Sequence, residues 1–522
     1  MFIEKIDAWS QRCPHRIAHR HRDSATTYET LKTHSDALCL WIEEQSRGIG
    51  RTPVVVYGHK QAVMLAAFLA CGKAGLPYVP VDGSVPAGRL RQIIDSSGAR
   101  IVLTAAPLPE ALGKTTLQGS LAPAPPCYAA HLGQVPPAAW ALRPEDVCYI
   151  IYTSGSTGVP KGVQITRRSL ESFLDWVGGL YRPLEAAEVF LNQAPFSFDL
   201  SVMDLYMSLV SGGTLWSVDR DQAASPAALF DSLGESRVTF WVSTPSFAAM
   251  CLADPGFNSG LLPDLKYFLF CGEVLAHDTA ARLKSRFPGA RVENMYGPTE
   301  ACVAVTSLTV TAAVLNDYNP LPVGRPKPDC RVLVCRPEEL NRLMADGTPP
   351  GPPEPLPEGE PGEIVIAGPS VSAGYLNNPG QTRKSFFAWA DGGRTWPAYR
   401  TGDAGFWRDG LLFFQGRFDF QLKLHGYRIE PGDIEEHLRR VDWVGNAVVL
   451  GVEQNGRVAY LKAFVTTPGP VDNQFEARLK LRNSLLEKLP GYMIPRSFAF
   501  LERLPMTPNG KVDRRRLLEE SR

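Results

Sequence analysis

The stretch Tyr149–Val163, YIIYTSGSTGVPKGV, begins as a buried strand and turns into residues that cannot continue one. Its glycines Gly155, Gly158 and Gly162 let the backbone approach a ligand closely or take positive φ. Serine and threonine hydroxyls and bare N–H groups are donors suited to phosphate oxygens, and Lys161 adds a point charge. We therefore expect a loop that cradles nucleotide phosphates; the alternative is a flexible surface loop.

This loop differs from a Walker A motif, which has Gly before its Lys and Ser or Thr after it. Pro160 and Gly162 occupy those places here. Around the loop, apolar runs alternate with helical patterns, as where TPVVVYG (Thr52–Gly58) precedes QAVMLAAFLACGKAG (Gln61–Gly75). Such alternation indicates βαβ units in a mainly parallel sheet, with ligands at the carboxyl ends of the strands.

The alternation of strand and helix patterns ends at about Val323. From there the short runs CRVLVCR, GEIVIAG and LLFFQGR predict a smaller antiparallel β section. Within it, the Pro/Glu/Gly-rich stretch Asp346–Gly362 is expected to be a solvated surface loop. After Arg417 the pattern becomes α+β and about 100 residues long, the size of a compact domain. We expect an α/β protein with a large N-terminal domain, 1–417, and a small mobile C-terminal domain, 418–522.

Composition limits the partners. Lys plus Arg and Asp plus Glu are 54 each, so no global field attracts nucleic acid or an anionic membrane. The ten cysteines contain no CxxC pair, which indicates free thiols in a reducing cytosol. No run reaches the roughly 18 apolar residues of a membrane span. The opening residues predict an amphipathic helix and not a signal peptide, so we expect a cytoplasmic protein.

TSGSTGVPKG resembles the phosphate-loop signature of the adenylate-forming superfamily, which includes acyl-CoA synthetases, luciferases and adenylation domains of peptide synthetases. Further motifs of that superfamily follow in order over nearly the whole chain. They are YGPTE (Tyr296–Glu300), YRTGD (Tyr399–Asp403), GRFDFQLKLHGYRIEPGDIE (Gly416–Glu435), LPGYMIP (Leu489–Pro495) and NGKVDR (Asn509–Arg514).

The resemblance implies that a carboxylate attacks the α-phosphate of ATP, with catalysis mainly by electrostatic positioning. Lys511 resembles the mobile lysine that reaches both reactants, and Glu300 the magnesium-associated acid, although a lone Glu could equally cap a turn. Asp419 looks like the hinge about which the small domain rotates. The implied ATP-binding set is Thr153, Ser154, Gly155, Thr157, Lys161, Asn294, Met295, Tyr296, Gly297, Pro298, Thr299, Asp403, Phe414, Arg417 and Lys511.

APFSFDLSVMDLY (Ala194–Tyr206) bears on which carboxylate is activated, because it puts Asp199 beside apolar walls. A buried carboxylate is costly without a cationic partner. In amino-acid-activating members the matching Asp pairs with the substrate ammonium; the alternative is an N-cap or surface Asp. Asp204 is interpreted as a helix-surface residue.

Segments around this pocket resemble the members that activate D-alanine for the D-alanylation of teichoic acid. That resemblance implies that Cys271 and Val303 line a small pocket beside the substrate, although Cys271 could equally be a core hydrophobe. A methyl-sized preference is worth only about 1–3 kcal/mol, so discrimination should be leaky. Cys302 departs from the Thr expected there.

The sequence thus predicts an ATP- and Mg²⁺-dependent ligase that forms D-alanyl-AMP, with Asp199 and Lys511 as its central residues. The chain ends just after the Lys511 motif, so we expect a separate phosphopantetheinylated carrier protein as the acceptor. A stand-alone enzyme that adenylates L-alanine, glycine or serine for a peptide product remains the alternative. An acyl-CoA ligase is disfavoured by Asp199, and a binding module without turnover by the intact motifs.

Overall fold

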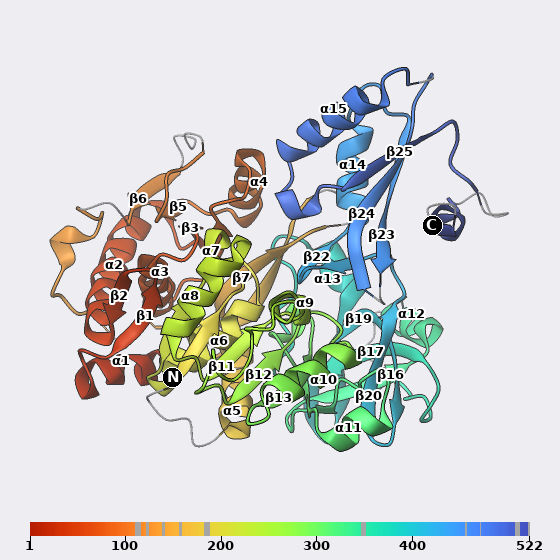
Figure 1. Ribbon diagram of the computed structural model, residues 1–522. Helices are drawn as coiled ribbons and strands as arrows, with labels where there is room; N and C mark the ends of the chain where they lie inside the picture. Colours follow the sequence, from red (N-terminus) through yellow and green to blue (C-terminus); the bar gives the residue numbers. More distant parts are fainter. Residues whose placement is uncertain are drawn as a thin grey trace.

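The computed structural model describes residues 1–109, 116–121, 125–137, 141–155, 159–181, 188–345, 351–454, 457–469, 471–506 and 512–519. Two sheets and their covering helices form the larger part of the molecule, and the C-terminal elements lie at one side of it (Figure 1).

The larger sheet is parallel in its middle and antiparallel at both edges. Its central strands are buried on both faces, which explains their continuous aromatic and aliphatic runs. Its order is β15 (Arg325–Pro326), β14 (Thr306–Thr309), β13 (Arg291–Tyr296), β12 (Tyr267–Phe270), β11 (Phe240–Ser243), β9 (Val189–Asn192), β10 (Thr214–Ser217), β1 (Ile17–His21) and β2 (Ser24–Thr27).

The second sheet carries the quoted Ser/Gly loop. It is parallel except that β7 and β8 pair antiparallel, so the loop joins neighbouring strands at one edge of the sheet. Its order is β6 (Leu117–Ser120), β5 (Ile101–Thr104), β3 (Val54–Gly58), β4 (Tyr78–Asp82), β7 (Val147–Thr153) and β8 (Lys161–Thr166).

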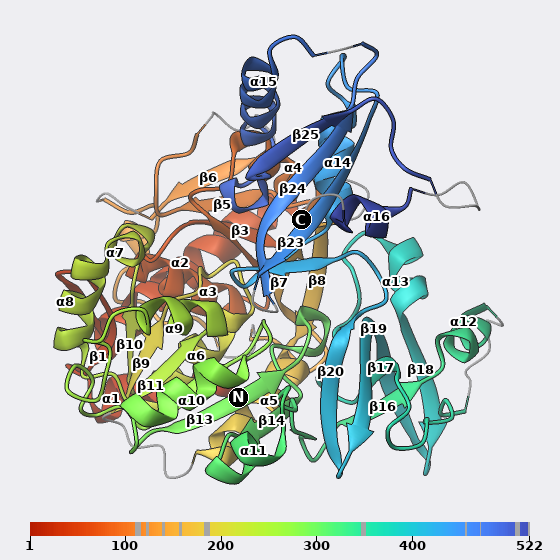
Figure 2. The ribbon, with the colours of Figure 1, turned by 45° about the vertical axis from the view of Figure 1, so that its right-hand side comes forward.

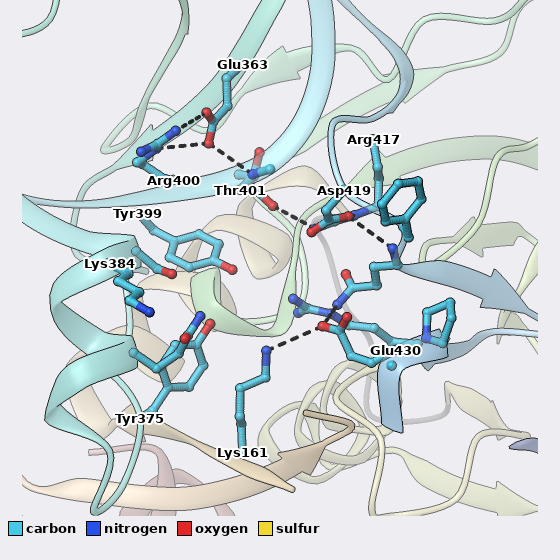
Figure 3. Close-up of a pocket in the computed structure, with 18 of the residues that line it drawn as sticks. Lys161, Glu363, Tyr375, Lys384, Tyr399, Arg400, Thr401, Arg417, Asp419 and Glu430 are labelled. Atoms are coloured by element: carbon cyan, nitrogen blue, oxygen red, sulfur yellow. Dashed lines mark hydrogen bonds and ion pairs between the residues drawn. The ribbon is translucent and has the colours of Figure 1, made fainter. Parts of the chain in front are cut away.

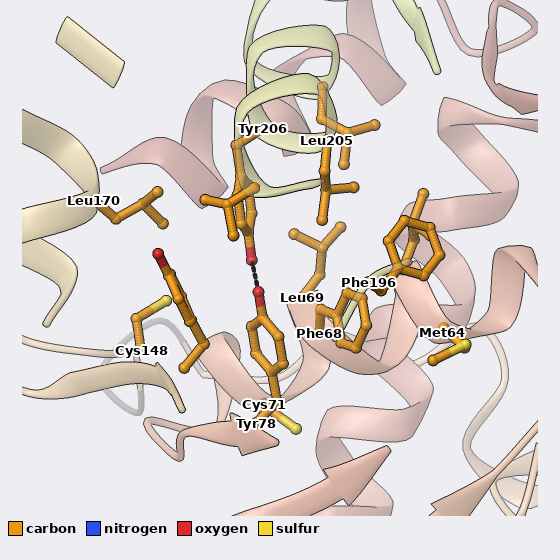
Figure 4. Packing of buried hydrophobic residues seen from close by; sticks show 14 of the residues in the cluster. Met64, Phe68, Leu69, Cys71, Tyr78, Cys148, Leu170, Phe196, Leu205 and Tyr206 are labelled. Carbon is orange, nitrogen blue, oxygen red and sulfur yellow. Dashed lines mark hydrogen bonds between the residues drawn. The ribbon is translucent and has the colours of Figure 1, made fainter. Parts of the chain in front are cut away.

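The largest core cluster joins strands of both sheets to helices packed against them. Figure 4 shows part of it, where the hydroxyls of Tyr78 and Tyr206 meet at 2.9 Å. α3 is buried nearly all round, as its apolar sequence predicts. The helices of this part are α1 (Phe2–Arg12), α2 (Tyr28–Ile49), α3 (Ala62–Lys73), α4 (Ala87–Ser97), α5 (Arg167–Leu180), α6 (Leu200–Ser211), α7 (Arg220–Ala224), α8 (Pro226–Ser236), α9 (Pro245–Cys251), α10 (His277–Arg286) and α11 (Ala312–Asp317).

A smaller antiparallel sheet follows, which confirms the antiparallel β section predicted from about Val323. Residues 346–350 of the Pro-rich stretch lie outside the described residues, and the part from 351 to 362 is not simply solvated: Leu356 is buried, and its N–H donates to the Val334 carbonyl at 2.7 Å. An apolar residue within the stretch anchors it to the sheet. The elements are β16 (Arg331–Cys335), α12 (Pro337–Ala345), β17 (Gly362–Ala367), α13 (Pro379–Ser385), β18 (Phe386–Asp391), β19 (Arg394–Arg408) and β20 (Leu411–Arg417).

The C-terminal elements have a core of their own, drawn from residues 424–498. A short hairpin reaches back toward the larger part, and helices of this part pack on a sheet of order β23-β24-β25 (Figure 2). The elements are β21 (Leu422–Leu424), β22 (Tyr427–Ile429), α14 (Pro431–Arg439), β23 (Asn446–Gln454), β24 (Arg457–Thr466), α15 (Gln474–Leu486), β25 (Ser497–Leu501) and α16 (Arg514–Glu519).

The expected fold class is confirmed: mainly parallel sheets, a smaller β section and an α+β C-terminal part. All ten cysteines lie within the described residues and are free. In the described part of the chain, no helix has both the length and the apolarity to cross a membrane.

Candidate active site

The Ser/Gly loop begins and ends at residues that face each other across β7 and β8. Thr153 pairs with Lys161 in the strand register, and both are buried. A Cβ added at Gly155 would lie 1.9 Å from the carbonyl oxygen of Val159, so this position requires glycine. The two described ends of the loop therefore approach closely, and Ser154 and Lys161 lie at the same edge of the sheet.

The β21–β22 hairpin of the C-terminal part contacts this loop. The Ser154 hydroxyl donates to the Arg428 carbonyl at 2.9 Å and accepts from the Glu430 N–H at 3.0 Å. The ammonium of Lys161 lies 3.4 Å from the Glu430 carboxylate (Figure 3). Two of the groups expected to bind phosphate thus hold the C-terminal part in this arrangement.

Glu300 lies in the turn after β13 and is fully buried. Its carboxylate accepts from Arg428 Nη1 at 2.6 Å and from the Tyr375 hydroxyl at 2.8 Å. Burial would raise the pKa of Glu300, but the Arg428 guanidinium overrides burial and holds the pKa at about 2. This acid is therefore ionised and suited to a cation.

Asp403 organises a second cluster at the start of the β19–β20 pair. It is buried, accepts from the Tyr296 hydroxyl at 2.6 Å and forms an ion pair with Arg417. Arg417 also donates from Nε to Asp419 at 2.6 Å. The Phe414 ring lies 6.1 Å from the Tyr296 ring. A carboxylate beside two aromatic rings is suited to binding the sugar and base of a nucleoside.

A cavity of about 480 Å³ lies between these two clusters. It is walled by β19, β20 and α13 on one side and by the C-terminal hairpin on the other (Figure 3). Its cationic lining comes from Lys161, Lys384, Arg400, Arg417, Arg428 and Arg514, which are donors suited to phosphate oxygens. Carboxylates of Glu363, Asp419, Glu430 and Glu435 offset part of that charge.

Asp199 is partly buried at the N-cap of α6, yet its side chain caps no backbone N–H. Desolvation raises its pKa, and a hydrogen bond from the Thr299 side chain offsets part of that rise. The Cys271 thiol donates to the Val303 carbonyl at 3.4 Å, so the two expected pocket residues are in contact. Val303 has φ of +70°, a strained conformation for a β-branched residue.

These clusters accompany a match to one family. Residues 6–376 match the AMP-binding enzyme family, and residues 433–511 match the AMP-binding enzyme C-terminal domain. The chain belongs to the AMP-binding enzyme family. Among curated relatives, the D-alanine–D-alanyl carrier protein ligases of Bacillus cytotoxicus and Bacillus anthracis are each 48% identical to this AMP-binding enzyme, and the matches cover 99% of both chains in each comparison.

Solved structures share the fold. The Vibrio cholerae adenylation domain AlmE in complex with glycyl-adenosine-5'-phosphate has a TM-score of 0.80 at 23% identity, covering 100% of this chain and 97% of its own. An NRPS protein containing adenylation and PCP domains, bound to a vinylsulfonamide inhibitor, has a TM-score of 0.79 at 25% identity, covering 99% and 84%.

The remaining expected ATP residues lie on β13 and the turn after it. Asn294 donates from Nδ2 to the Pro322 carbonyl at 2.8 Å, and Met295 packs in the main core. A Cβ at Gly297 would lie 2.6 Å from Ala304 Cα, so this turn also requires glycine. Pro298 leads into the short helix Thr299–Ala301. Thr157 and Lys511 lie outside the described residues.

Asp204 is the one corrected interpretation in this region. It was expected on a helix surface, but it is fully buried and accepts from Asn192 Nδ2 at 2.9 Å. α6 is buried on nearly every side, so no residue in its first turns reaches solvent. The apolar spacing of LSVMDLY could have indicated this.

Three contributors to the site received no role from the sequence. Arg428 and Glu430 lie inside a quoted motif, but only the structure shows which groups they contact. Glu273 clamps the hairpin, because its carboxylate accepts from the N–H groups of Gly426 at 2.6 Å and Ser246 at 3.0 Å. No local pattern around Glu273 signals this contact, since its partners are distant in sequence.

Proposed function

We propose that this AMP-binding enzyme activates D-alanine with ATP as D-alanyl-AMP and transfers the alanyl group to a carrier protein. The transfer is to the phosphopantetheine thiol of a separate carrier protein. The chain is 48% identical over its full length to relatives named D-alanine–D-alanyl carrier protein ligase, which supports the assignment.

The observation that carries the choice of an amino acid is the environment of Asp199. Desolvation disfavours its charged form, and the Thr299 hydrogen bond with the fields of Lys423 and Arg428 offsets this only in part, so the pKa of Asp199 stays raised. A substrate ammonium is the group that would compensate a carboxylate in such a place. An acyl or aryl acid would bring no cation to pair with that carboxylate.

In the first step, a carboxylate oxygen of D-alanine attacks the α-phosphorus of ATP, and the bond to the leaving pyrophosphate breaks. Ser154, Lys161 and the loop amides would hold the phosphates, while Asp403 and Tyr296 would hold the nucleoside. Lys511 is proposed to reach both reactants. Magnesium suits Glu300, an ionised buried acid, because Mg²⁺ usually takes one or two carboxylates besides phosphate oxygens. It would neutralise phosphate charge.

In the second step, the carrier thiol attacks the alanyl carbonyl, a thioester forms, and AMP leaves with the bonding electrons. We assign the arrangement seen here to that step, because the hairpin occupies the phosphate loop and Glu300. The proposed rotating unit is residues 418–522, with Asp419 as the hinge, and residues 1–417 form the fixed unit. The ion pair from Arg417 to Asp419 spans that boundary.

The proposed setting is the cytoplasm, where ATP is available, with D-alanylation of teichoic acid as the pathway served. The rival is a stand-alone adenylation enzyme for L-alanine, glycine or serine, and a fold neighbour that holds glycyl-adenosine-5'-phosphate makes it worth testing.

Amino-acid-dependent exchange of labelled pyrophosphate into ATP separates the two. We expect D-alanine to give the highest kcat/KM across a panel of D- and L-amino acids. A higher value for L-alanine, glycine or serine would establish the rival.

A further inference from the structure

A buried cation links the second sheet to the segment that carries Asp199. Lys60 follows β3 and is 0% exposed. Its ammonium donates to Asn192 Oδ1 and to the Ala194 carbonyl, both at 2.5 Å. Both partners are neutral, and a lysine is almost never fully buried unless it is paired. Its retention here calls for a compensating group.

The compensating group lies one amide further on. Asn192 donates from Nδ2 to Asp204 at 2.9 Å, so the amide bridges a cation and a buried carboxylate. Ser217 also donates to Asn192 Oδ1, at 2.8 Å. Burial lowers the pKa of Lys60 to about 7, and Asp204 is foremost among the charges that oppose this fall.

These anchors bracket Asp199 along the chain. Asn192 ends β9, Ala194 lies in the connection from β9 to α6, and Asp204 lies in α6 after Asp199. The Lys60 ammonium also lies 4.9 Å from the Phe196 ring centroid. Figure 4 shows that ring packed beside Phe68 in the core. The segment between β9 and α6 is therefore anchored both before and after Asp199.

We propose that Lys60 is a positioning residue, which sets the place of the Asp199 carboxylate through Asn192, Ala194 and Asp204. Its bonds go to the connection and not toward the phosphate loop. This inference rests on the proposed function, because it assigns Lys60 to recognition of the substrate amine. Its loss should weaken amino-acid binding and leave ATP binding intact.

The test measures KM for D-alanine and for ATP in pyrophosphate exchange with Lys60→Met, which keeps an unbranched side chain only one atom shorter and removes the donors. Losing a buried partner predicts a KM for D-alanine about tenfold higher, with KM for ATP unchanged. Lys73→Met is the matched control: Lys73 is also buried, but it pairs with Asp36 and Asp7, away from this connection. That variant should lower Tm without changing KM for D-alanine.

Rescue distinguishes positioning from general stability. Asp204→Asn added to Lys60→Met removes the carboxylate left uncompensated, so the double variant should recover Tm but not KM for D-alanine. If Lys60→Met does not fold, Ser217→Ala removes a weaker donor to the same amide and should raise that KM about threefold.

Three results would overturn the inference: unchanged KM for D-alanine in the folded variants, equal rises in KM for both substrates, or a rise in Lys73→Met as large as in Lys60→Met. If no amino acid of the panel supports pyrophosphate exchange by the wild-type protein, the proposed function and this inference are both refuted. Wild-type exchange with an unaffected Lys60→Met would refute only the inference. If another amino acid is the better substrate, it replaces D-alanine as the probe.

Discussion

Arg428 Nη1 lies 2.6 Å from the carboxylate of Glu300, and both residues are largely shielded from solvent. The pair joins a hairpin of the C-terminal part to the turn that follows β13. An acid expected to associate with magnesium therefore has an arginine as its cation in this arrangement. Glu300 would associate with magnesium in the proposed first step and pairs with Arg428 in the arrangement assigned to the second step. The second step should therefore depend on Arg428 more than the first.

Arg428→Met should separate the two half-reactions. Removing one partner of a buried ion pair costs about 3–5 kcal/mol, so this arrangement should lose most of its population. Carrier loading from supplied D-alanyl-AMP should fall at least about tenfold, since each 1.4 kcal/mol is a factor of ten. Pyrophosphate exchange should remain within a few-fold of wild type. Arg440→Met, whose side chain is exposed, is the control; equal loss of both activities in Arg428→Met would contradict this account.

Gly155→Ala tests the shape of the phosphate loop. The added methyl group would lie 1.9 Å from the Val159 carbonyl oxygen, so the backbone must move. KM for ATP should rise about tenfold or more, since the loop amides lose their alignment. Gly48→Ala, where nothing lies within 4 Å of the added carbon, should behave as wild type. A wild-type KM for ATP in Gly155→Ala would show that this loop does not bind the phosphates.

Amino-acid binding should depend on pH through Asp199. Desolvation raises its pKa above the ordinary value, so a falling pH protonates it earlier than a solvated aspartate. Since only the ionised carboxylate attracts an ammonium, KM for D-alanine should rise as the pH falls through that raised pKa. In Asp199→Asn that KM should be high at every pH, while KM for ATP stays near the wild-type value. A pH-dependent rise that persists in Asp199→Asn would assign the titration to another group.

Much of this could be predicted from the sequence because the informative signals are local. The Ser/Gly loop after a buried strand, the alternation of strands and helices, and the end of that alternation near Val323 each depend on neighbouring residues. The structure has the loop between β7 and β8 and the antiparallel sheet after β15, as expected. The Asp403–Tyr296 contact brings together two motifs that the sequence identified separately.

The unpredicted features depend on contacts between distant segments. Glu273 and Gly426 meet only because the hairpin folds back on the larger part, and Lys60 meets Ala194 only because two sheets lie together. Asp204 was misjudged because a single acid in a helix usually faces solvent. The buried amide of Asn192, which makes its burial tolerable, is contributed by a strand end twelve residues earlier.

Lys511→Ala should nearly abolish pyrophosphate exchange and spare transfer from supplied D-alanyl-AMP. The reason is that an ammonium between the two anionic reactants serves adenylation, whereas the thiol attacks a neutral carbonyl. Quenched assays that follow pyrophosphate exchange and transfer from supplied D-alanyl-AMP separately measure the rate of each half-reaction. Lys480→Ala, at an exposed lysine of α15 outside the cavity lining, is a suitable comparison. If both half-reactions of Lys511→Ala fall together, the role assigned to Lys511 is wrong.

The most direct test of the proposed function is acylation of a carrier. The assay mixes purified enzyme, ATP, Mg²⁺ and a phosphopantetheinylated D-alanyl carrier protein with either D- or L-alanine. The intact mass of the carrier is then measured by mass spectrometry. The account predicts that D-alanine adds one alanyl group, released by hydroxylamine as a thioester should be, at a rate above that with L-alanine. A carrier that gains no mass with D-alanine, or gains it faster with L-alanine, would contradict the account.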